Sequence, residues 1–201
     1  MGLAQKVPRL TPMEYLAIER AASTKSEFYD GEMFAMAGGS PRHSLIASNL
    51  IREFGNRLDG KRCVPYTGDL RIQVEATGLF TYPDLSVICG PLQFAEGTTD
   101  TVTNPTVIVE VLSPSTEGYD RGEKFRQYRQ IPSLREYLLV SQRDAHIEHF
   151  IRSKDDDWTL HEACGREAEL PSPALGISVS LAVVYQRIEF LPGPIQVLPG
   201  S

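Results

Sequence analysis

Residues 106–112 read Thr-Val-Ile-Val-Glu-Val-Leu, and this stretch decides how the segments around it are interpreted. Alternate side chains of a strand point to opposite faces, so the three valines would share one face and Glu110 would share the other with Ile108 and Leu112. A strand that is apolar on both faces normally lies in the middle of a covered sheet. A carboxylate buried there needs a cation, a hydrogen-bond donor or a metal ion beside it. Glu110 is therefore a candidate functional residue; the alternative is a structural glutamate that pairs with an arginine or reaches solvent.

The segments on either side of this strand predict an α/β protein. Apolar residues in 42–58 recur with a period near 3.6, which is typical of an amphipathic helix. Three segments bounded by Gly or Pro each read as one strand: 63–75, 79–90 and 104–113. Residues 120–131 return to a helical pattern, and 135–141 read as another strand. This order predicts a central mixed sheet flanked by helices, with an α-β-β-β-α-β core.

Hairpins are expected before and after this core. Asp30-Gly31 lies between two apolar stretches and indicates a tight turn. Residues 145–164 read as a second hairpin around a polar turn. We expect one domain over residues 10–190 and an extended tail rich in Pro and Gly over 191–201.

Composition limits the class of protein. The chain has 201 residues, of which 41% are hydrophobic and 23% charged, and its net charge is −6. These values favour a folded core, and they make a general nucleic-acid coat a poor interpretation, since a polyanion would need a local basic patch or a metal ion. Three distant cysteines, Cys63, Cys89 and Cys164, argue against a disulfide scaffold and a zinc site. Without a secretory signal or a long apolar run, we expect a cytoplasmic protein that does not span a membrane.

Asp84 is a second acidic residue in a strand-like segment. Pro83 lacks the backbone donor of a strand ladder, which places Asp84 near a strand start or a bulge. Alone, this aspartate would more often be a turn residue than a ligand. On a strand next to Glu110, it forms a carboxylate pair that a hard divalent cation would neutralise.

Lys124 lies on the inner stripe of the predicted helix 120–131, with Tyr128 and Ile131. Asp120 reads as the N-cap of that helix. The stripe predicts that at least the stem of Lys124 points inward, and a solvent-facing lysine is the alternative. Two carboxylates and a lysine suit metal-assisted phosphodiester cleavage, in which the carboxylates hold Mg²⁺ and the lysine positions water or offsets charge.

The motifs resemble those of the Uma-type family of putative restriction endonucleases, bacterial members of the PD-(D/E)XK nuclease-like superfamily. Four stretches carry the resemblance: YPDLSVIC (82–89), PTVIVEVLSPST (105–116), DRGEKFRQY (120–128) and PSLREYLLV (132–140). It extends over residues 10–185 and implies a restriction-endonuclease-like fold and hydrolysis of DNA, expected to be duplex. It also implies Mg²⁺ as cofactor, with Mn²⁺ as a possible substitute, and a possible homodimer.

The same resemblance assigns site residues. It implies Asp84 and Glu110 as metal ligands and catalytic residues. The motif expects lysine two residues after the glutamate, where this sequence has Leu112, and Lys124 on the following helix matches the displaced catalytic lysine.

Two further positions match recurrent family residues and would support the site. His43 opens the helix 42–58, and a structural histidine is the alternative. Glu32 lies in the first hairpin, where a solvent-facing acid is the alternative.

Other candidates are weaker. His146 and His149 alternate to opposite faces of a strand and make a poor ligand pair. Eight basic residues would form either a rim for a phosphate backbone or ordinary solvated charge: Arg52, Arg57, Lys61, Arg62, Arg71, Arg121, Arg126 and Arg129.

The sequence thus favours a metal-dependent DNA endonuclease. One alternative is a catalytically inactive relative that binds nucleic acid or a protein partner. Another is a hydrolase of a small phosphorylated molecule, which would have a closed pocket.

Overall fold

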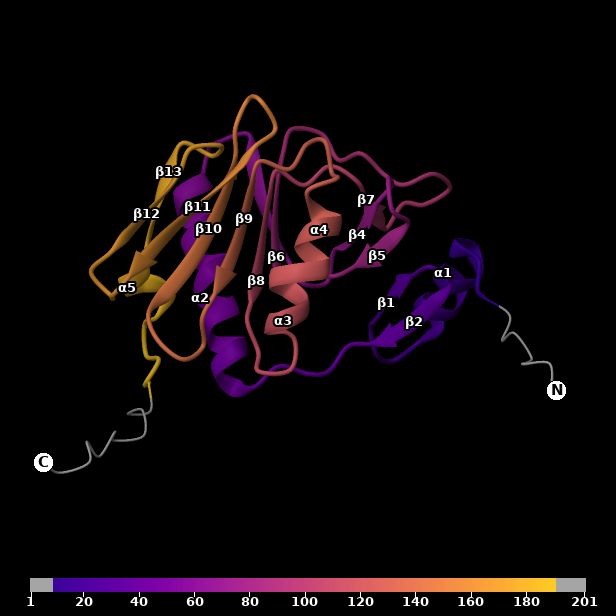
Figure 1. Ribbon diagram of the computed structural model, residues 1–201, viewed down its shortest axis with the longest axis horizontal. Coiled ribbons are helices and arrows are strands. Elements are labelled where there is room, and N and C mark those ends of the chain that lie inside the picture. Colours follow the sequence, from indigo (N-terminus) through magenta and orange to yellow (C-terminus); the bar gives the residue numbers. More distant parts are fainter. Residues whose placement is uncertain (1–8, 191–201) are drawn as a thin grey trace, which may run out of the picture.

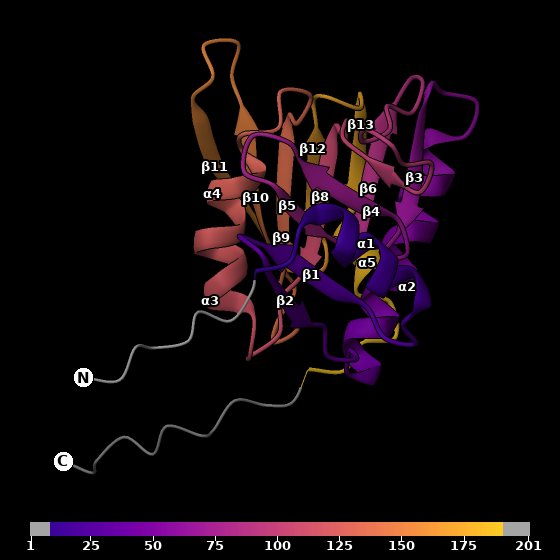
Figure 2. The same ribbon diagram turned by 90° about the vertical axis from the view of Figure 1, so that its right-hand side faces the viewer.

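The computed structural model describes residues 9–190, in which two mixed sheets lie side by side (Figures 1 and 2). The larger sheet has the order β11 (Trp158–Cys164), β10 (His146–Arg152), β9 (Glu136–Val140), β8 (Val107–Val111), β6 (Leu85–Cys89) and β3 (Cys63–Thr67). The smaller has the order β2 (Glu32–Ala35), β1 (Ser26–Tyr29), β5 (Leu79–Thr81), β4 (Arg71–Val74) and β7 (Thr101–Val102). Only the β8–β9 and β4–β7 pairs are parallel.

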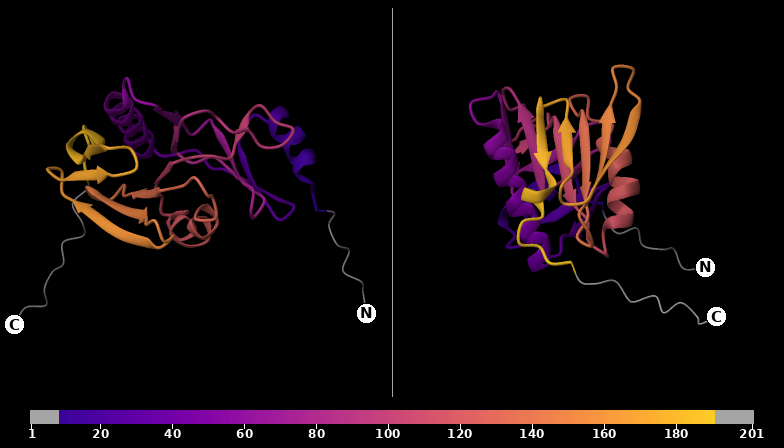
Figure 3. Two further views of the ribbon diagram at one scale, coloured as in Figure 1. Left: turned by 90° about the horizontal axis from the view of Figure 1, so that it is seen from above. Right: turned by 90° about the vertical axis from the view of Figure 1, so that its left-hand side faces the viewer.

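Helices and a third hairpin cover these sheets. The helices are α1 (Pro12–Ala21), α2 (Pro41–Leu58), α3 (Glu117–Tyr119), the π-helical turn η1 (Asp120–Lys124), α4 (Phe125–Tyr128) and α5 (Leu181–Val184). The hairpin pairs β12 (Glu169–Ser172) with β13 (Ile177–Ser180). Figure 3 shows α2 and this hairpin on one side of the larger sheet, with the α3–η1–α4 segment on the other.

β8 contributes to a different apolar cluster on each face. Its three valines pack in the cluster that contains α2 and the β12–β13 hairpin. Ile108 and Leu112 pack in the cluster formed with β4, β5 and Tyr128 of α4. The prediction of a strand buried on both faces is confirmed, and Glu110 lies on the face toward the smaller sheet and the helical segment. The mixed α/β architecture is confirmed as well.

The predicted strand boundaries were wrong in two segments. Residues 63–75 form β3 and β4, separated by a turn in which the Leu70 N–H donates to the Thr67 carbonyl at 3.1 Å. Residues 79–90 form β5 and β6, separated at Pro83. In each case the two halves belong to different sheets. Two of the five strands of the smaller sheet, β4 and β5, are therefore strands that the sequence pattern had merged with strands of the larger one.

The helix expected over 120–131 begins earlier and is irregular. A continuous helical segment runs from Glu117 to Tyr128, so Asp120 is an interior residue and not the N-cap. Ser113 takes part in capping this segment: its hydroxyl accepts the N–H of Thr116 at 3.2 Å, and its carbonyl accepts that of Glu117 at 2.9 Å. Asp120 is consequently available for other contacts.

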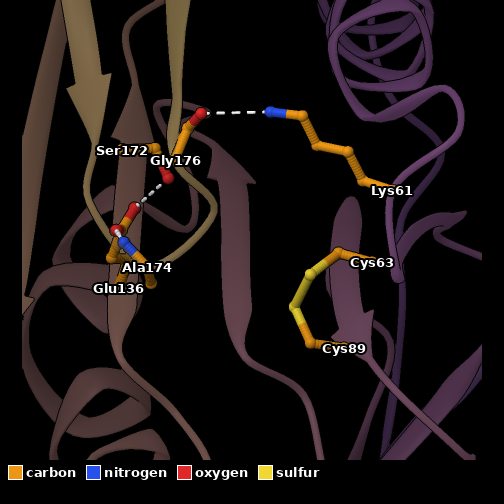
Figure 4. Close-up of a disulfide and its surroundings, with 7 residues drawn as sticks. All are labelled: Lys61, Cys63, Cys89, Glu136, Ser172, Ala174 and Gly176. Carbon is orange, nitrogen blue, oxygen red and sulfur yellow. Dashed lines mark hydrogen bonds between the residues drawn. A yellow bond between two sulfur atoms is a disulfide. The ribbon is translucent and has the colours of Figure 1, made fainter.

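A disulfide joins Cys63 of β3 to Cys89 of β6 (Figure 4). The two residues are direct partners in the antiparallel register of these strands, with Cα atoms 4.0 Å apart. The spacing of the cysteines, which argued against a disulfide scaffold, did not indicate this single disulfide, because a separation of 26 residues hides the fact that β3 and β6 are neighbours. Cys164 is free and exposed.

The β12–β13 hairpin is fastened to the larger sheet through a buried carboxylate. Glu136 of β9 accepts the Ser172 hydroxyl at 2.6 Å and the Ala174 N–H at 2.7 Å (Figure 4). His149 of β10 lies 3.0 Å from the same carboxylate. This hairpin was missed in the sequence, since its strands are short and only partly apolar.

Three further predictions concern the first hairpin, the C-terminal tail and membrane-spanning helices. The first hairpin turns at Asp30 and Gly31, whose φ angles of 49° and 82° match the tight turn expected there. The tail expected over 191–201 lies outside the described residues. No helix within residues 9–190 is long and apolar enough to cross a membrane.

Candidate active site

Glu110 is a buried carboxylate with two specific partners. Its side chain is about 6% exposed. Oε1 accepts the Tyr128 hydroxyl at 2.8 Å and lies 3.0 Å from Lys124 Nζ. The cation that a carboxylate needs in this position is therefore the lysine singled out in the sequence.

Asp84 immediately precedes β6, after Pro83. The register pairs Leu85 of β6 with Val109 of β8, so Asp84 and Glu110 occupy the next positions along the two strands. Asp84 Oδ2 accepts the Val111 N–H at 2.7 Å and lies 3.2 Å from His43 Nε2. The structure thus brings both predicted carboxylates and His43 together at one end of the larger sheet.

Helix α2 positions His43 through its first turn. Ser40 is the N-cap, and its hydroxyl accepts the His43 N–H at 3.1 Å. The hydrogen bond with Asp84 raises the pKa of His43 from its ordinary value, against the opposing effect of burial. His43 is thus favoured as a cation beside the Asp84 carboxylate.

Lys124 lies at the centre of a group of carboxylates. Its Nζ is 3.0 Å from Glu27 Oε1, 3.0 Å from Glu110 Oε1 and 3.7 Å from Asp120 Oδ1. Burial favours the neutral amine, but the charges of these three groups outweigh burial and raise the pKa of Lys124 well above its usual value. The amine is accordingly a permanent cation at neutral pH.

Glu27 and Asp120 are site residues that sequence reasoning missed. Glu27 comes from β1 of the smaller sheet, and it also accepts hydrogen bonds from the Thr81 and Tyr119 hydroxyls. Glu32, which was the predicted hairpin acid, is exposed on β2 beside the turn and does not line the cavity described below. Alternation along the hairpin does not distinguish the two acids; burial and contact with Lys124 do.

These groups line a cavity of about 660 Å³. Its walls include residues 34–40, which run from the end of β2 to α2, and residues 113–116, between β8 and α3. Four carboxylates line it: Glu27, Asp84, Glu110 and Asp120. A second lysine at the wall, Lys25, is already paired with Asp69. Negative charge therefore exceeds positive charge inside the cavity.

Burial, together with the neighbouring carboxylates, changes the pKa of two of these groups. Burial raises the pKa of Glu110 to about 8; the Lys124 ammonium opposes this shift, while the charges of Asp120 and Asp84 add to it. Burial likewise raises the pKa of Asp120. A bound cation would relieve both effects.

The ligand chemistry fits a hard divalent ion. Among residues 9–190, no three side chains of the metal-binding types converge into a preformed ion site. Lys124 accounts for part of this, since its Nζ lies between Glu27 and Glu110. Mg²⁺ is commonly held by one or two carboxylates together with water and substrate phosphate. Asp84 and Glu110 match that pattern of oxygen ligands.

Of the two alternatives for the basic residues, a phosphate-binding rim or ordinary solvated charge, the cavity lining does not support the first. None of the eight basic residues considered in the sequence lines it. Arg71 is buried and pairs with Asp100, and Arg57 pairs with Glu53 on its own helix. These side chains stabilise local structure.

His146 and His149 point away from one another, as strand alternation predicted. His149 is buried against Glu136 at 3.0 Å, and His146 lies 2.9 Å from Glu162. The two imidazoles have separate structural partners.

Family comparison agrees with the resemblance found in the motifs. The model of the Uma2 family, described as "Putative restriction endonuclease", matches residues 12–184. The chain belongs to the Uma2 family. The matched range contains every cavity residue discussed above.

Individual relatives extend this comparison. The chain is 42% identical over 185 residues to the uncharacterized protein slr1290 of Synechocystis sp., covering 91% of this chain and 95% of that one. It is 38% identical over 161 residues to the uncharacterized protein sll1609 of Synechocystis sp., covering 80% and 91%.

A solved structure shares the Uma2 fold. It is a putative nuclease belonging to DUF820 from Anabaena variabilis, and it superposes with a TM-score of 0.71. The match covers 88% of this chain and 97% of the other at 16% identity. The restriction-endonuclease-like fold expected from the motifs is thus shared with a solved structure.

Proposed function

We propose that the protein is a Mg²⁺-dependent DNA endonuclease that hydrolyses phosphodiester bonds in this cavity, with Mn²⁺ as a substitute ion. The observation that carries the proposal is the 3.0 Å contact between Lys124 Nζ and Glu110 Oε1, beside Asp84 on the adjoining strand. This contact supplies the lysine that the motif lacks at Leu112. Membership of the Uma2 family supports nuclease chemistry.

Asp84 and Glu110 would hold the ion. The hydrogen bonds described above all involve one oxygen of each carboxylate, Oδ2 of Asp84 and Oε1 of Glu110. They fix the orientation of both groups, so the second oxygen of each can be offered to a cation. When bound there, a divalent cation polarises the phosphate and activates water as a nucleophile.

Lys124 acts as a charged donor. The surrounding carboxylates hold its pKa well above the usual value, so it does not serve as a base for the attacking water. Its ammonium offsets negative charge that develops on the phosphate in the transition state. Tyr128 and His43 act through Glu110 and Asp84, as positioning residues.

The test is DNA cleavage by wild type, Asp84→Asn and Glu110→Gln with Mg²⁺, Mn²⁺ or EDTA. These isosteric changes remove charge and keep volume, so we expect each to lower kcat/KM by at least about 100-fold. Glu32→Gln is the matched control, because Glu32 is an exposed acid outside the cavity. All variants pass through the same purification, which exposes any contaminating nuclease.

Two results would count against the proposal. If Glu110→Gln cleaves DNA with Mg²⁺ as fast as wild type does, hydrolysis does not depend on this site. DNA binding without cleavage in either ion would instead favour the catalytically inactive relative that Leu112 suggests.

A further inference from the structure

Phe34 is an aromatic residue that remains exposed inside a charged cavity. It lies on β2, the residue is 49% exposed, and it lines the cavity that contains Lys124. The register pairs Phe34 directly with Glu27 of β1. Directly paired residues point to the same face of a sheet. The ring is therefore presented on the face from which Glu27 reaches Lys124.

The wall that begins at Phe34 changes in character along its length. Residues 34–37 read Phe-Ala-Met-Ala and carry no charge, and all four line the cavity. The wall then passes through two glycines to Ser40 and His43, the polar first turn of α2. An uncharged wall (residues 34–37) and the groups proposed for phosphodiester hydrolysis thus line the same cavity, and Phe34 adjoins Glu27 in the strand register.

A nucleotide has the same division into an apolar base and a charged phosphate. With phosphate beside Lys124, the base faces the apolar wall, and stacking on an aromatic ring is the sequence-tolerant way in which proteins hold unpaired bases. A volume of about 660 Å³ is in the range of pockets that enclose one small ligand. Enzymes that do chemistry on a base act on single strands or extrude the target nucleotide from the duplex, and a base that stacks on Phe34 would likewise have to be unpaired.

We propose that Phe34 forms a nucleobase-stacking subsite, and that the DNA strand is unpaired at the nucleotide adjoining the cleaved bond. The inference rests on the proposed function for the place of the phosphate. It specifies what that function leaves open, namely the strandedness of the substrate at the cut.

Binding tests the stacking subsite directly. The probes are a fluorescein-labelled single-stranded oligothymidylate and an abasic deoxyribose-phosphate strand of equal length, titrated in Ca²⁺ with a gel check that neither is cut. Wild type should prefer the oligothymidylate. Phe34→Ala should weaken its binding by about 5-fold to 150-fold and leave binding of the abasic strand unchanged, because only the base is lost from the ring. Phe34→Trp should retain the preference.

Phe94→Ala is the matched control. Phe94 is also an exposed phenylalanine, at 47%, and it does not line the cavity. We expect it to bind both strands as wild type does. Equal losses for Phe34→Ala and Phe94→Ala, or equal losses on both strands, would overturn the subsite. So would a change from dimer to monomer in Phe34→Ala with the base preference intact, since the ring would then belong to an interface between copies.

Cleavage tests the strandedness. We expect faster cutting of a single strand than of the same strand in a perfectly paired duplex, and equal rates would overturn this part of the inference. Failure of the subsite is distinguishable from failure of the proposed function. Phe34-dependent binding without any cutting retains the subsite and rejects hydrolysis; cutting that is unaffected in Phe34→Ala rejects the subsite and retains hydrolysis.

Discussion

Lys124 shows how one buried residue serves both stability and the proposed chemistry. Its ammonium contacts Glu27 and Glu110 at 3.0 Å in a region almost closed to solvent. Buried pairs of this kind contribute modestly as a whole, but removing one partner leaves uncompensated charge. We therefore expect Lys124 to contribute to the stability of the protein even without substrate.

We therefore predict that Lys124→Met lowers the free energy of unfolding by about 3–5 kcal/mol, measured by urea denaturation. Adding Glu27→Gln should recover part of that loss, because it removes one of the carboxylates left without a cation. An equal effect of Glu27→Gln in wild type and in Lys124→Met would contradict direct coupling between the two groups.

Glu110 gives a pH-dependent prediction for the metal-free protein. Its pKa of about 8 in the folded state lies above the ordinary glutamate value, so the folded state binds a proton that the unfolded state releases. The stability that Glu110 contributes is fully present below about pH 4.5 and is lost as pH rises from there through about 8. Glu110→Gln lacks this decline and should become more stable than wild type toward pH 8, as measured by thermal melting in EDTA. If the melting temperatures of wild type and Glu110→Gln fall equally over this pH range, Glu110 is not the group that titrates.

At the scale of elements, the core strand and α2 were predictable because their apolar patterns are long and regular. Apolar side chains alternate along β8 from Val107 to Val111, and apolar side chains recur along one stripe of α2 over several turns. In the structure these side chains are buried on the predicted faces. The short strands were not separable, because a turn at Gly68 or a break at Pro83 looks like a local irregularity in one longer strand. Their assignment to two sheets depends on long-range pairing that no local pattern contains.

The irregular helical segment explains why Asp120 was misassigned. An aspartate followed three residues later by an acid suggests a cap, but Ser113 caps the preceding turn. Three site residues were marked by the sequence around them. Asp84 follows Pro83, Glu110 interrupts an apolar strand, and Lys124 lies on the inner stripe of a helix. Glu27 carried no such signal, because its role depends on an approach of two sheets.

The β3–β6 disulfide supplies a prediction at the same scale. It closes a loop of 26 residues, so reduction should lower the free energy of unfolding by roughly 3–4 kcal/mol. Cys63→Ala/Cys89→Ala should show the same loss and no further effect of reductant, with Cys164→Ala as the control. If reductant lowers the stability of the double variant as much as that of wild type, the loss does not come from the Cys63–Cys89 disulfide.

At the scale of the whole molecule, the cavity depends on both sheets. Glu27 comes from the smaller sheet, Glu110 from the larger one, and Lys124 from the helical segment that lies beside them. The excess of carboxylates opposes this assembly, and a cation that binds only the folded state would favour it.

Metal binding should consequently raise the melting temperature. At a free Mg²⁺ concentration about 100 times Kd, we expect about 2.7 kcal/mol of added stability in wild type and little in Asp84→Asn/Glu110→Gln. Differential scanning calorimetry with and without Mg²⁺ measures this. Equal stabilisation of both proteins would mean that the ion binds elsewhere.

The spread of the site along the chain has a consequence during synthesis. Glu27 must meet Lys124, and the sheet that carries Glu110 is completed through β9, so a nascent chain held on the ribosome before these residues emerge has no assembled cavity. The groups proposed for catalysis thus come together only after Lys124 and β9 have been synthesised, well after Glu27.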